Sequence, residues 1–358
     1  MTSTPTSAPA LAGGPVPKAF VASDLSWVSI DHGWALGTAP CASPPCTSVL
    51  ETGDGGRSWV GRPAPRAPLA GSTLECDGDA CVAGIRFADD QTGWAFGPAL
   101  FRTADRGQNW QAERSPPVAA LETAAGHVFR IVSESPLSGC LPHCPYHVEE
   151  AAPGGGSWTR LPAPPLEGYR TMVLIDWPRL YVVAFGNPAG GAGDAHAQFA
   201  RSDDGGRHWL TLKDPCGHDA TAENDATSAA AAPGRFLAVL CRGRGASTAA
   251  FVLTSNDAGS TWATRHSVTE TALTLAAGSP DVLSVWATGT GQRKFIATSH
   301  DHGTTWTTTL TTMKPDGPNA PLWLGYEDPR TGRAFFGGQQ LWTTRDGGAT
   351  WAETTFGP

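Results

Sequence analysis

Six aspartates recur along the chain in the same local setting, and they are the first residues to consider for chemistry. Each stands two residues before a glycine and five residues before a tryptophan. They are Asp54, Asp105, Asp204, Asp257, Asp301 and Asp346. Each segment has a single carboxylate and no run of alternating oxygen ligands, so calcium binding is not expected. Because an aspartate can accept hydrogen bonds from backbone N–H groups of its own turn, we interpret these residues as structural.

The tryptophans that end these segments set the period of a repeat. A degenerate copy of the segment, Ala152–Trp158, fills the one gap in the series. The seven tryptophans are Trp59, Trp110, Trp158, Trp209, Trp262, Trp306 and Trp351, separated by 51, 48, 51, 53, 44 and 45 residues. A period in this range is typical of repeat architectures. The glycine permits the positive φ of a tight turn, and the tryptophan offers an apolar face for packing between neighbouring units.

The repeated pattern Ser/Thr-x-Asp-x-Gly-x-Thr/Ser-Trp closely resembles the Asp-box, or BNR, repeat of β-propellers. The resemblance implies an all-β fold: a seven-bladed β-propeller of four-stranded antiparallel blades, with Asp-box turns between the third and fourth strands. In blade 1 we expect Ser26–Ile30 to be the innermost strand and Gly33–Gly37 the second. The latter and Gly93–Gly97 resemble blades of photosystem assembly factors. We expect residues 1–19, rich in Pro, Ser, Thr and Ala, to be disordered, and residues 20–358 to form one propeller with sequence-contiguous blades.

Composition limits the partners and the compartment. A net charge of −8 gives no reason to expect nucleic acid, and no apolar run is long enough to span a bilayer. The eight cysteines fall into near neighbours, which favours disulfides and an oxidising compartment over free thiols in the cytosol. The predicted pairs are Cys41–Cys46, Cys76–Cys81, Cys140–Cys144 and Cys216–Cys241. The first residues lack the features of a signal peptide, so we expect a secreted protein whose export signal is missing from this chain.

The strand order predicts how the loops divide between the two faces of the ring. In a four-stranded meander the first and third turns lie on one face, and the second turn and the link to the next blade lie on the other. All Asp-boxes should therefore share one face, and all four disulfides should lie on the opposite one. The disulfide face has the longer, irregular loops, where partner binding is expected.

The sequence lacks the residue patterns of the enzymes that share its repeats. Sialidases also carry Asp-boxes, but the nearest match to their first arginine motif, Phe129–Val132, lacks the proline, and none of the four tyrosines stands in a sialidase context. Xyloglucanase-type glycosidases need two propellers around a cleft. The charged residues expected on the inner strands, Arg86, Glu122 and Arg170, are too scattered for an acid/base pair. We therefore expect no catalytic constellation and no cofactor.

The segment Cys140–His147 resembles a metal-ligand cluster, because it contains two cysteines and two histidines within eight residues. The alternative is a disulfide-closed loop with two surface histidines. The six other paired cysteines favour that alternative, so no metal site is expected.

Four glutamines suggest a different kind of site. They fall in or beside loops that follow second strands, flanked by glycine and small residues: Gln198, Gln292, Gln339 and Gln340. Exposed, mobile glutamines are the acyl donors that a transglutaminase requires. Ordinary polar loop residues are the alternative at each position.

Together these features predict a secreted, monomeric, non-catalytic propeller that acts through protein–protein interaction. In type, size and setting it resembles secreted bacterial propellers that induce autolysis of a thermolysin-like metalloprotease and serve as transglutaminase substrates. That resemblance implies a metalloprotease and a transglutaminase as partners. Two alternatives stay open: a sialidase-like, carbohydrate-active enzyme, and a membrane-tethered assembly factor.

Overall fold

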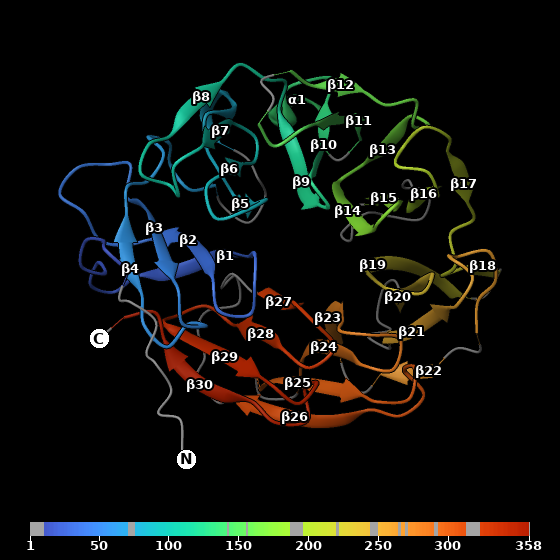
Figure 1. Ribbon diagram of the computed structural model, residues 1–358. Coiled ribbons are helices and arrows are strands. Elements are labelled where there is room, and N and C mark those ends of the chain that lie inside the picture. Colours follow the sequence, from blue (N-terminus) through green and yellow to red (C-terminus); the bar gives the residue numbers. More distant parts are fainter. Residues whose placement is uncertain are drawn as a thin grey trace, which may run out of the picture.

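Seven antiparallel sheets form a closed ring (Figure 1). The computed structural model describes residues 11–70, 76–141, 143–154, 157–186, 196–219, 222–243, 250–263, 266–268, 271–289, 293–312 and 323–357. Each sheet contains four consecutive strands as a meander, and the third and fifth sheets have one additional strand. The first strand of each meander faces the ring axis and the last lies at the rim (Figure 1). The fold is the seven-bladed β-propeller predicted from the repeats.

Every blade is contiguous in sequence. Blades 1 to 4 consist of β1 (Val21–Trp27), β2 (Gly33–Thr38), β3 (Thr47–Thr52) and β4 (Val60–Arg62); β5 (Gly84–Phe87), β6 (Gly93–Phe96), β7 (Leu100–Thr103) and β8 (Gln111–Glu113); β9 (Val118–Ala124), β10 (His127–Ser133), β11 (Cys144–Ala151), β12 (Thr159–Arg160) and β13 (Leu166–Gly168); and β14 (Arg170–Asp176), β15 (Arg179–Phe185), β16 (Gln198–Ser202) and β17 (Leu210–Leu212).

The remaining blades follow the same plan. Blades 5 to 7 consist of β18 (His218–Asp219), β19 (Ala222–Ala232), β20 (Phe236–Gly243), β21 (Ala250–Ser255) and β22 (His266–Val268); β23 (Thr271–Ala277), β24 (Leu283–Thr288), β25 (Lys294–Ser299) and β26 (Thr307–Thr312); and β27 (Trp323–Tyr326), β28 (Gly332–Phe335), β29 (Gln340–Thr344) and β30 (Ala352–Thr355). Two short helices occur in loops: η1 (Asp77–Asp79) and α1 (Leu137–Cys140). The helices among the described residues are too short to cross a bilayer.

The innermost strand of blade 1 differs from the sequence prediction. The structure places β1 at Val21–Trp27, whereas Ser26–Ile30 was expected. The hydroxyl of Ser29 accepts hydrogen bonds from the backbone N–H groups of Asp31 and His32, so the chain already turns at this serine. The strand therefore ends at Trp27. Its pairing with β2 begins at Val21 and includes Asp24, a residue that the sequence prediction had left outside the strand.

Each of the six Asp-boxes is a closed hydrogen-bonded staple. In the first, Asp54 Oδ1 accepts from the Thr52 hydroxyl at 2.9 Å and from the Ser58 backbone N–H at 2.9 Å, while Oδ2 accepts from the Ser58 hydroxyl at 2.6 Å. Three bonds at the same positions recur around Asp105, Asp204, Asp257, Asp301 and Asp346. At Asp105 and Asp204 the Asn109 amide and the His208 ring take the place of the second hydroxyl. The side-chain and backbone hydrogen bonds from Thr261 lower the pKa of Asp257 to about 2. These carboxylates hold turns and are not free for chemistry.

The Asp-boxes share a face with the turns between first and second strands. In blade 1 the N–H of Gly55 donates to the carbonyl of Asp31 at 2.8 Å, which joins the box to the β1–β2 turn. Four further blades have the equivalent bond, from Arg106 to Gln91, Gly205 to Pro178, Ala258 to Arg235 and Gly347 to Arg330. We call this side of the ring the Asp-box face and the other side the disulfide face.

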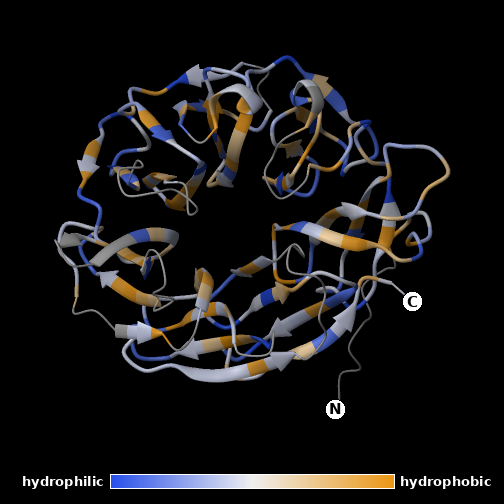
Figure 2. Cartoon of the chain, turned by 180° about the vertical axis from the view of Figure 1, so that it is seen from behind, coloured by the Kyte–Doolittle hydropathy of each residue, from blue (hydrophilic) through white to orange (hydrophobic). Residues whose placement is uncertain are grey.

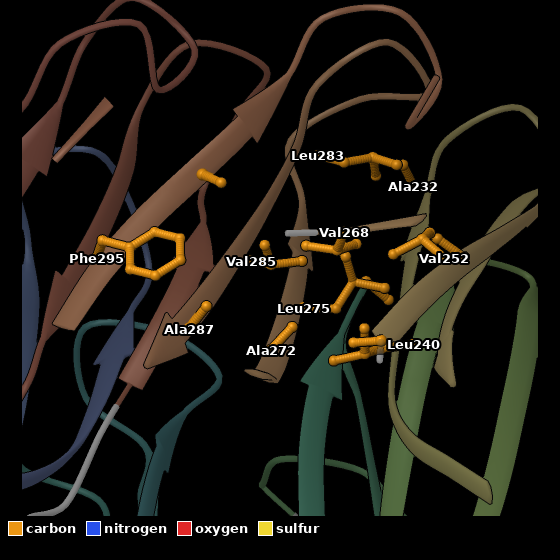
Figure 3. Packing of buried hydrophobic residues seen from close by; sticks show 14 of the residues in the cluster. Ala232, Leu240, Val252, Val268, Ala272, Leu275, Leu283, Val285, Ala287 and Phe295 are labelled. Carbon is orange, nitrogen blue, oxygen red and sulfur yellow. The ribbon is translucent and has the colours of Figure 1, made fainter. Parts of the chain in front are cut away.

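Apolar packing between neighbouring blades forms the core. Hydrophobic segments run along the strands, and many connecting turns are hydrophilic (Figure 2). Between blades 5 and 6, Leu240 and Val252 face Leu275 and Val285 (Figure 3). Three of the box tryptophans also bridge to the preceding blade, because their indole N–H groups donate to Pro63, Glu113 and Thr309. The blades are therefore joined by side chains, not by shared strands.

The ring also closes by packing. In the part of the chain that the structure describes, no strand is shared between blade 1 and blade 7. Phe356, which follows the last strand, packs against Phe20 and Trp59 with ring centroids 5.6 and 5.2 Å apart. Residues 11–19, which the sequence placed in a disordered segment, lie on this seam: Gly14 and Gly61 exchange two backbone hydrogen bonds, at 3.0 and 2.8 Å.

The structure joins the eight cysteines into four disulfides, Cys41–Cys46, Cys76–Cys81, Cys140–Cys144 and Cys216–Cys241. Two lie in loops after second strands, one lies in a link between blades, and Cys216, in such a link, joins Cys241 near the end of β20. All four belong to the disulfide face. Three of them close loops with a sequence separation of 4 or 5, so they mainly shape those loops.

Candidate functional site

A groove of about 680 Å³ crosses the disulfide face between blades 2 and 3. Its walls are the β6–β7 loop and β8 on one side and the β10–β11 loop on the other, and the link between β8 and β9 forms part of the lining. The lining residues include Asp79, Pro98, Leu100, Phe101, Ala112, Glu113, Arg114, Ser115, Pro116, Pro117, Glu134, Pro136 and His147. Gly78 and Asp79, which lie within the Cys76–Cys81 loop, also line it.

A buried charge network supports the blade 3 side of the groove. Arg130 in β10 is 3% exposed and donates to Glu149 Oε2 and to the Ser115 hydroxyl, the latter at 2.9 Å. Its guanidinium also lies over the indole of Trp158, 3.9 Å from the ring centroid. Burial acts to raise the pKa of Glu149, but hydrogen bonds from His147 and Arg130 outweigh it and lower that pKa. Arg130, from the sialidase-like segment, is thus neutralised within the protein and not presented to a substrate carboxylate.

Two carboxylates of the groove are engaged by neighbouring side chains. Glu113 accepts from the Trp158 indole at 3.3 Å. Glu134 accepts from Arg160 at 2.9 Å and lies 3.3 Å from His147 Nδ1. Catalysis by a carboxylate pair needs one group free to give a proton and another free to accept or attack. Glu113 and Glu134 are instead held by neighbouring side chains.

The metal-like segment forms a disulfide loop. Cys140 and Cys144 are bonded to each other, so neither offers a thiolate. His143 lies 3.4 Å from Glu167, and His147 lies 3.0 Å from Glu149. Among the described residues, no three His, Cys, Asp or Glu side chains are arranged to hold a metal ion.

Two of the three charged residues expected on inner strands do come together. Arg86 in β5 donates to Glu122 in β9 at 3.0 Å and to Asp24 in β1 at 2.7 Å, which links blades 1, 2 and 3. Burial raises the pKa of Asp24 despite the nearby guanidinium. Arg170 lies apart, because it donates to the carbonyl of Thr227 in blade 5. The sequence prediction missed Asp24 because it began the innermost strand of blade 1 at Ser26, whereas β1 begins at Val21.

The predicted glutamines have different surroundings. Gln339 is exposed in the β28–β29 hairpin, after two glycines with positive φ. Gln340 is half-buried in β29 and pairs with Thr355. Gln198 is half-buried in β16, and its side-chain oxygen accepts from the backbone of Glu167 at 3.1 Å. Gln292 lies outside the described residues.

The chain is similar to many solved structures, among them the following three. YCF48 bound to D1 peptide is 18% identical, with 95% of this chain and 97% of that chain covered and a TM-score of 0.57. Sqt1 of Saccharomyces cerevisiae is 9% identical, with coverage of 96% and 88% and a TM-score of 0.51. The GH74 xyloglucanase from Xanthomonas campestris is 12% identical, with coverage of 93% and 72% and a TM-score of 0.33, too low to bear on activity. At these identities the likeness shows the fold alone.

The sequence also matches a family model. No curated protein matches the chain. The model described as photosynthesis system II assembly factor YCF48 matches residues 67–357, which is most of the chain. The blade motifs Gly33–Gly37 and Gly93–Gly97 had pointed to the same group of propellers. The chain therefore belongs to the photosynthesis system II assembly factor YCF48 family.

Proposed function

We propose that this chain is a non-catalytic propeller that binds an extended segment of a partner protein in the groove between blades 2 and 3. The observation that carries the proposal is the groove itself, a concave site of about 680 Å³ in which Glu113 and Glu134 are already held by neighbouring side chains. Such a volume is within the range of ligand sites. Family membership supports an assembly or interaction role, and the similar YCF48 structure has a bound peptide.

The lining indicates the kind of segment. Pro98, Pro116, Pro117, Pro136 and Phe101 supply rigid apolar surface, which suits an extended segment with proline or aliphatic side chains. Three carboxylates, on Asp79, Glu113 and Glu134, line the groove with one arginine, Arg114. A segment with a basic residue beside its apolar ones fits this charge balance.

Filling the groove should abolish this binding. Ala112 is exposed in β8 and lines the groove, so Ala112→Trp places an indole in it without burying a new group. Linear peptides selected from a random library on the wild-type protein should bind Ala112→Trp at least tenfold more weakly in a fluorescence titration.

Thr211→Trp is the matched control, because Thr211 occupies the same exposed position after the box tryptophan in blade 4. It should bind like the wild type. Equal binding by Ala112→Trp would place the peptides elsewhere and refute the groove as their site.

The disulfides support an extracytoplasmic setting. Among the described residues all cysteines are bonded in pairs, and stable disulfides are characteristic of oxidising compartments. Secretion is therefore part of the proposal. A resemblance to the dispase autolysis-inducing protein suggests a thermolysin-like metalloprotease as the partner. The self-digestion of such a protease, followed by gel electrophoresis with and without this chain, tests whether the protease is the partner.

A second candidate function is that of a transglutaminase acyl donor, and Gln339 favours it. This side chain is exposed on the disulfide face, whereas Gln198 is tied to Glu167. Incubation with transglutaminase and a labelled amine, followed by peptide mapping, should label Gln339. The label should disappear in Gln339→Asn and persist in Gln198→Asn. Labelling that Gln339→Asn leaves unchanged would rule this site out.

A further inference from the structure

A second cavity, of about 610 Å³, opens at the ring axis on the Asp-box face. The ends of β1, β5, β9, β14 and β27 and the turns that follow them line it. We call it the axial pocket. We propose that the axial pocket binds an organic cation, an alkylammonium or alkylguanidinium group. This site lies on the face opposite the groove, so it goes beyond the partner-binding function proposed above.

The charges of the axial pocket exclude an anion and favour a cation. Asp24, Glu122, Glu327 and Asp328 lie in its wall or directly behind it, against the guanidiniums of Arg86 and Arg333. Arg86 forms ion pairs with Asp24 at 2.7 Å and with Glu122 at 3.0 Å. Its positive charge is therefore already compensated and does not attract an anionic ligand. The pocket therefore holds an excess of negative charge.

Glu327 offers an acceptor that the protein leaves unused. Its side chain lines the axial pocket and is 9% exposed. Arg333 Nη1 forms an ion pair with Glu327 Oε2, whereas Oε1 has no hydrogen-bond donor among the described residues. An unsatisfied buried carboxylate is costly, and a ligand N–H group donated to Oε1 would recover part of that cost.

The remaining walls suit the apolar stem of such a cation. Trp27, Trp323 and Tyr326 line the pocket on the blade 7 and blade 1 side. Aromatic rings contact alkyl chains and attract cations at their faces. Arg333 already lies over Trp27, 3.5 Å from the ring centroid, which shows that this corner accommodates a guanidinium. A bare metal ion is a poorer fit, because the described residues contain no cluster of three ligating side chains.

Calorimetric titration with four probes of matched size tests the proposal. Butylguanidinium and butylammonium should bind saturably at pH 8, and neutral butanol and anionic butyrate should not. Glu327→Gln should weaken cation binding at least tenfold. Glu353→Gln, the same change on the exposed outer strand β30 of the same blade, should leave it unchanged. No saturable cation binding, or equal losses in both variants, would overturn the proposal.

A second variant guards against a folding defect in Glu327→Gln. Ser29 is exposed at the pocket rim, so Ser29→Lys supplies the chain's own cation without removing a buried charge. It should compete with butylguanidinium and weaken its binding, and unchanged binding would count against the axial pocket. Acetyl-glycyl-arginine amide tests whether the natural ligand is a protein side chain or a small molecule. If it binds as tightly as butylguanidinium, the ligand is an arginine side chain of a protein. If only the free probes bind, the ligand is a small organic cation. Peptide binding in the groove is measured separately and is independent of these results.

Discussion

Replacing Glu51 by alanine is expected to lower the free energy of unfolding by about 3–5 kcal/mol, the cost of breaking a buried ion pair by removing one partner. Glu51 lies in β3 with no exposed surface. Its carboxylate accepts from His32 at 2.7 Å, from Arg106 at 2.6 Å and from Arg62. Arg106 belongs to the Asp-box of blade 2, so this one carboxylate joins two blades.

The physical reason is what the substitution leaves behind. The Arg62 side chain is 4% exposed, and without Glu51 its charge stays buried with no counter-charge. Burial acts to raise the pKa of Glu51, but hydrogen bonds from His32, Arg106 and Arg62 outweigh it and lower that pKa. The stabilisation is thus present above the ordinary glutamate pKa and is lost as the pH falls through the lowered value.

Denaturant unfolding at pH 7 checks this prediction. Glu353→Ala, on the exposed strand β30, is the surface control and should change the free energy of unfolding by less than about 0.5 kcal/mol. If Glu51→Ala lowers the free energy of unfolding by less than about 1 kcal/mol, the network around Glu51 stabilises the protein no more than a surface ion pair does.

Stability is also expected to fall by about 3 kcal/mol between pH 4.5 and pH 7 because of Glu327. Burial raises the pKa of this carboxyl from its ordinary 4.5 to about 7. Glu327 is paired with Arg333 from β28. The other charged groups that act on this pair are Asp328 from the same turn, Asp31 from the β1–β2 turn and Arg345 from the neighbouring Asp-box. Burial also lowers the pKa of Arg333, so desolvation dominates this pair.

The sign follows from proton binding. In this window the folded protein keeps a proton on Glu327 that the unfolded chain has released, so raising the pH favours unfolding until the folded protein is also ionised. Above about pH 7 Glu327 is ionised in both the folded and the unfolded protein, so its effect on the free energy of unfolding no longer changes with pH. Unfolding free energies measured across pH 4 to 8 should show this decline, and Glu327→Gln should remove it. An identical pH profile in the variant would show that another group titrates.

The fold could be predicted from sequence because its signals are local and repeated. An Asp-box needs only the Asp, the Gly with positive φ, a hydroxyl residue before the Asp and a polar residue before the tryptophan, and in all six copies the first hydroxyl donates to the Asp. Cysteines five residues apart pair within one loop whatever the rest of the ring does. The division of boxes and disulfides between the two faces followed from strand order.

The charge networks and cavities could not be predicted in this way. Glu51 and Arg106 are 55 residues apart in sequence, and Arg333 donates to Ile30 across the closing seam at a separation of 303 residues. Such contacts depend on how blades pack, which no local pattern encodes. The groove arises similarly, since its walls come from different blades and from loops without a shared motif.

Hydrogen–deuterium exchange on the complex with a selected peptide tests the proposed binding site most directly. The groove predicts slower exchange in the loops 97–100, 113–118 and 133–136, with exchange on the Asp-box face unchanged. Protection confined to the turns of the Asp-box face, with the groove loops exchanging as in the free protein, would contradict the proposal that partners bind on the disulfide face.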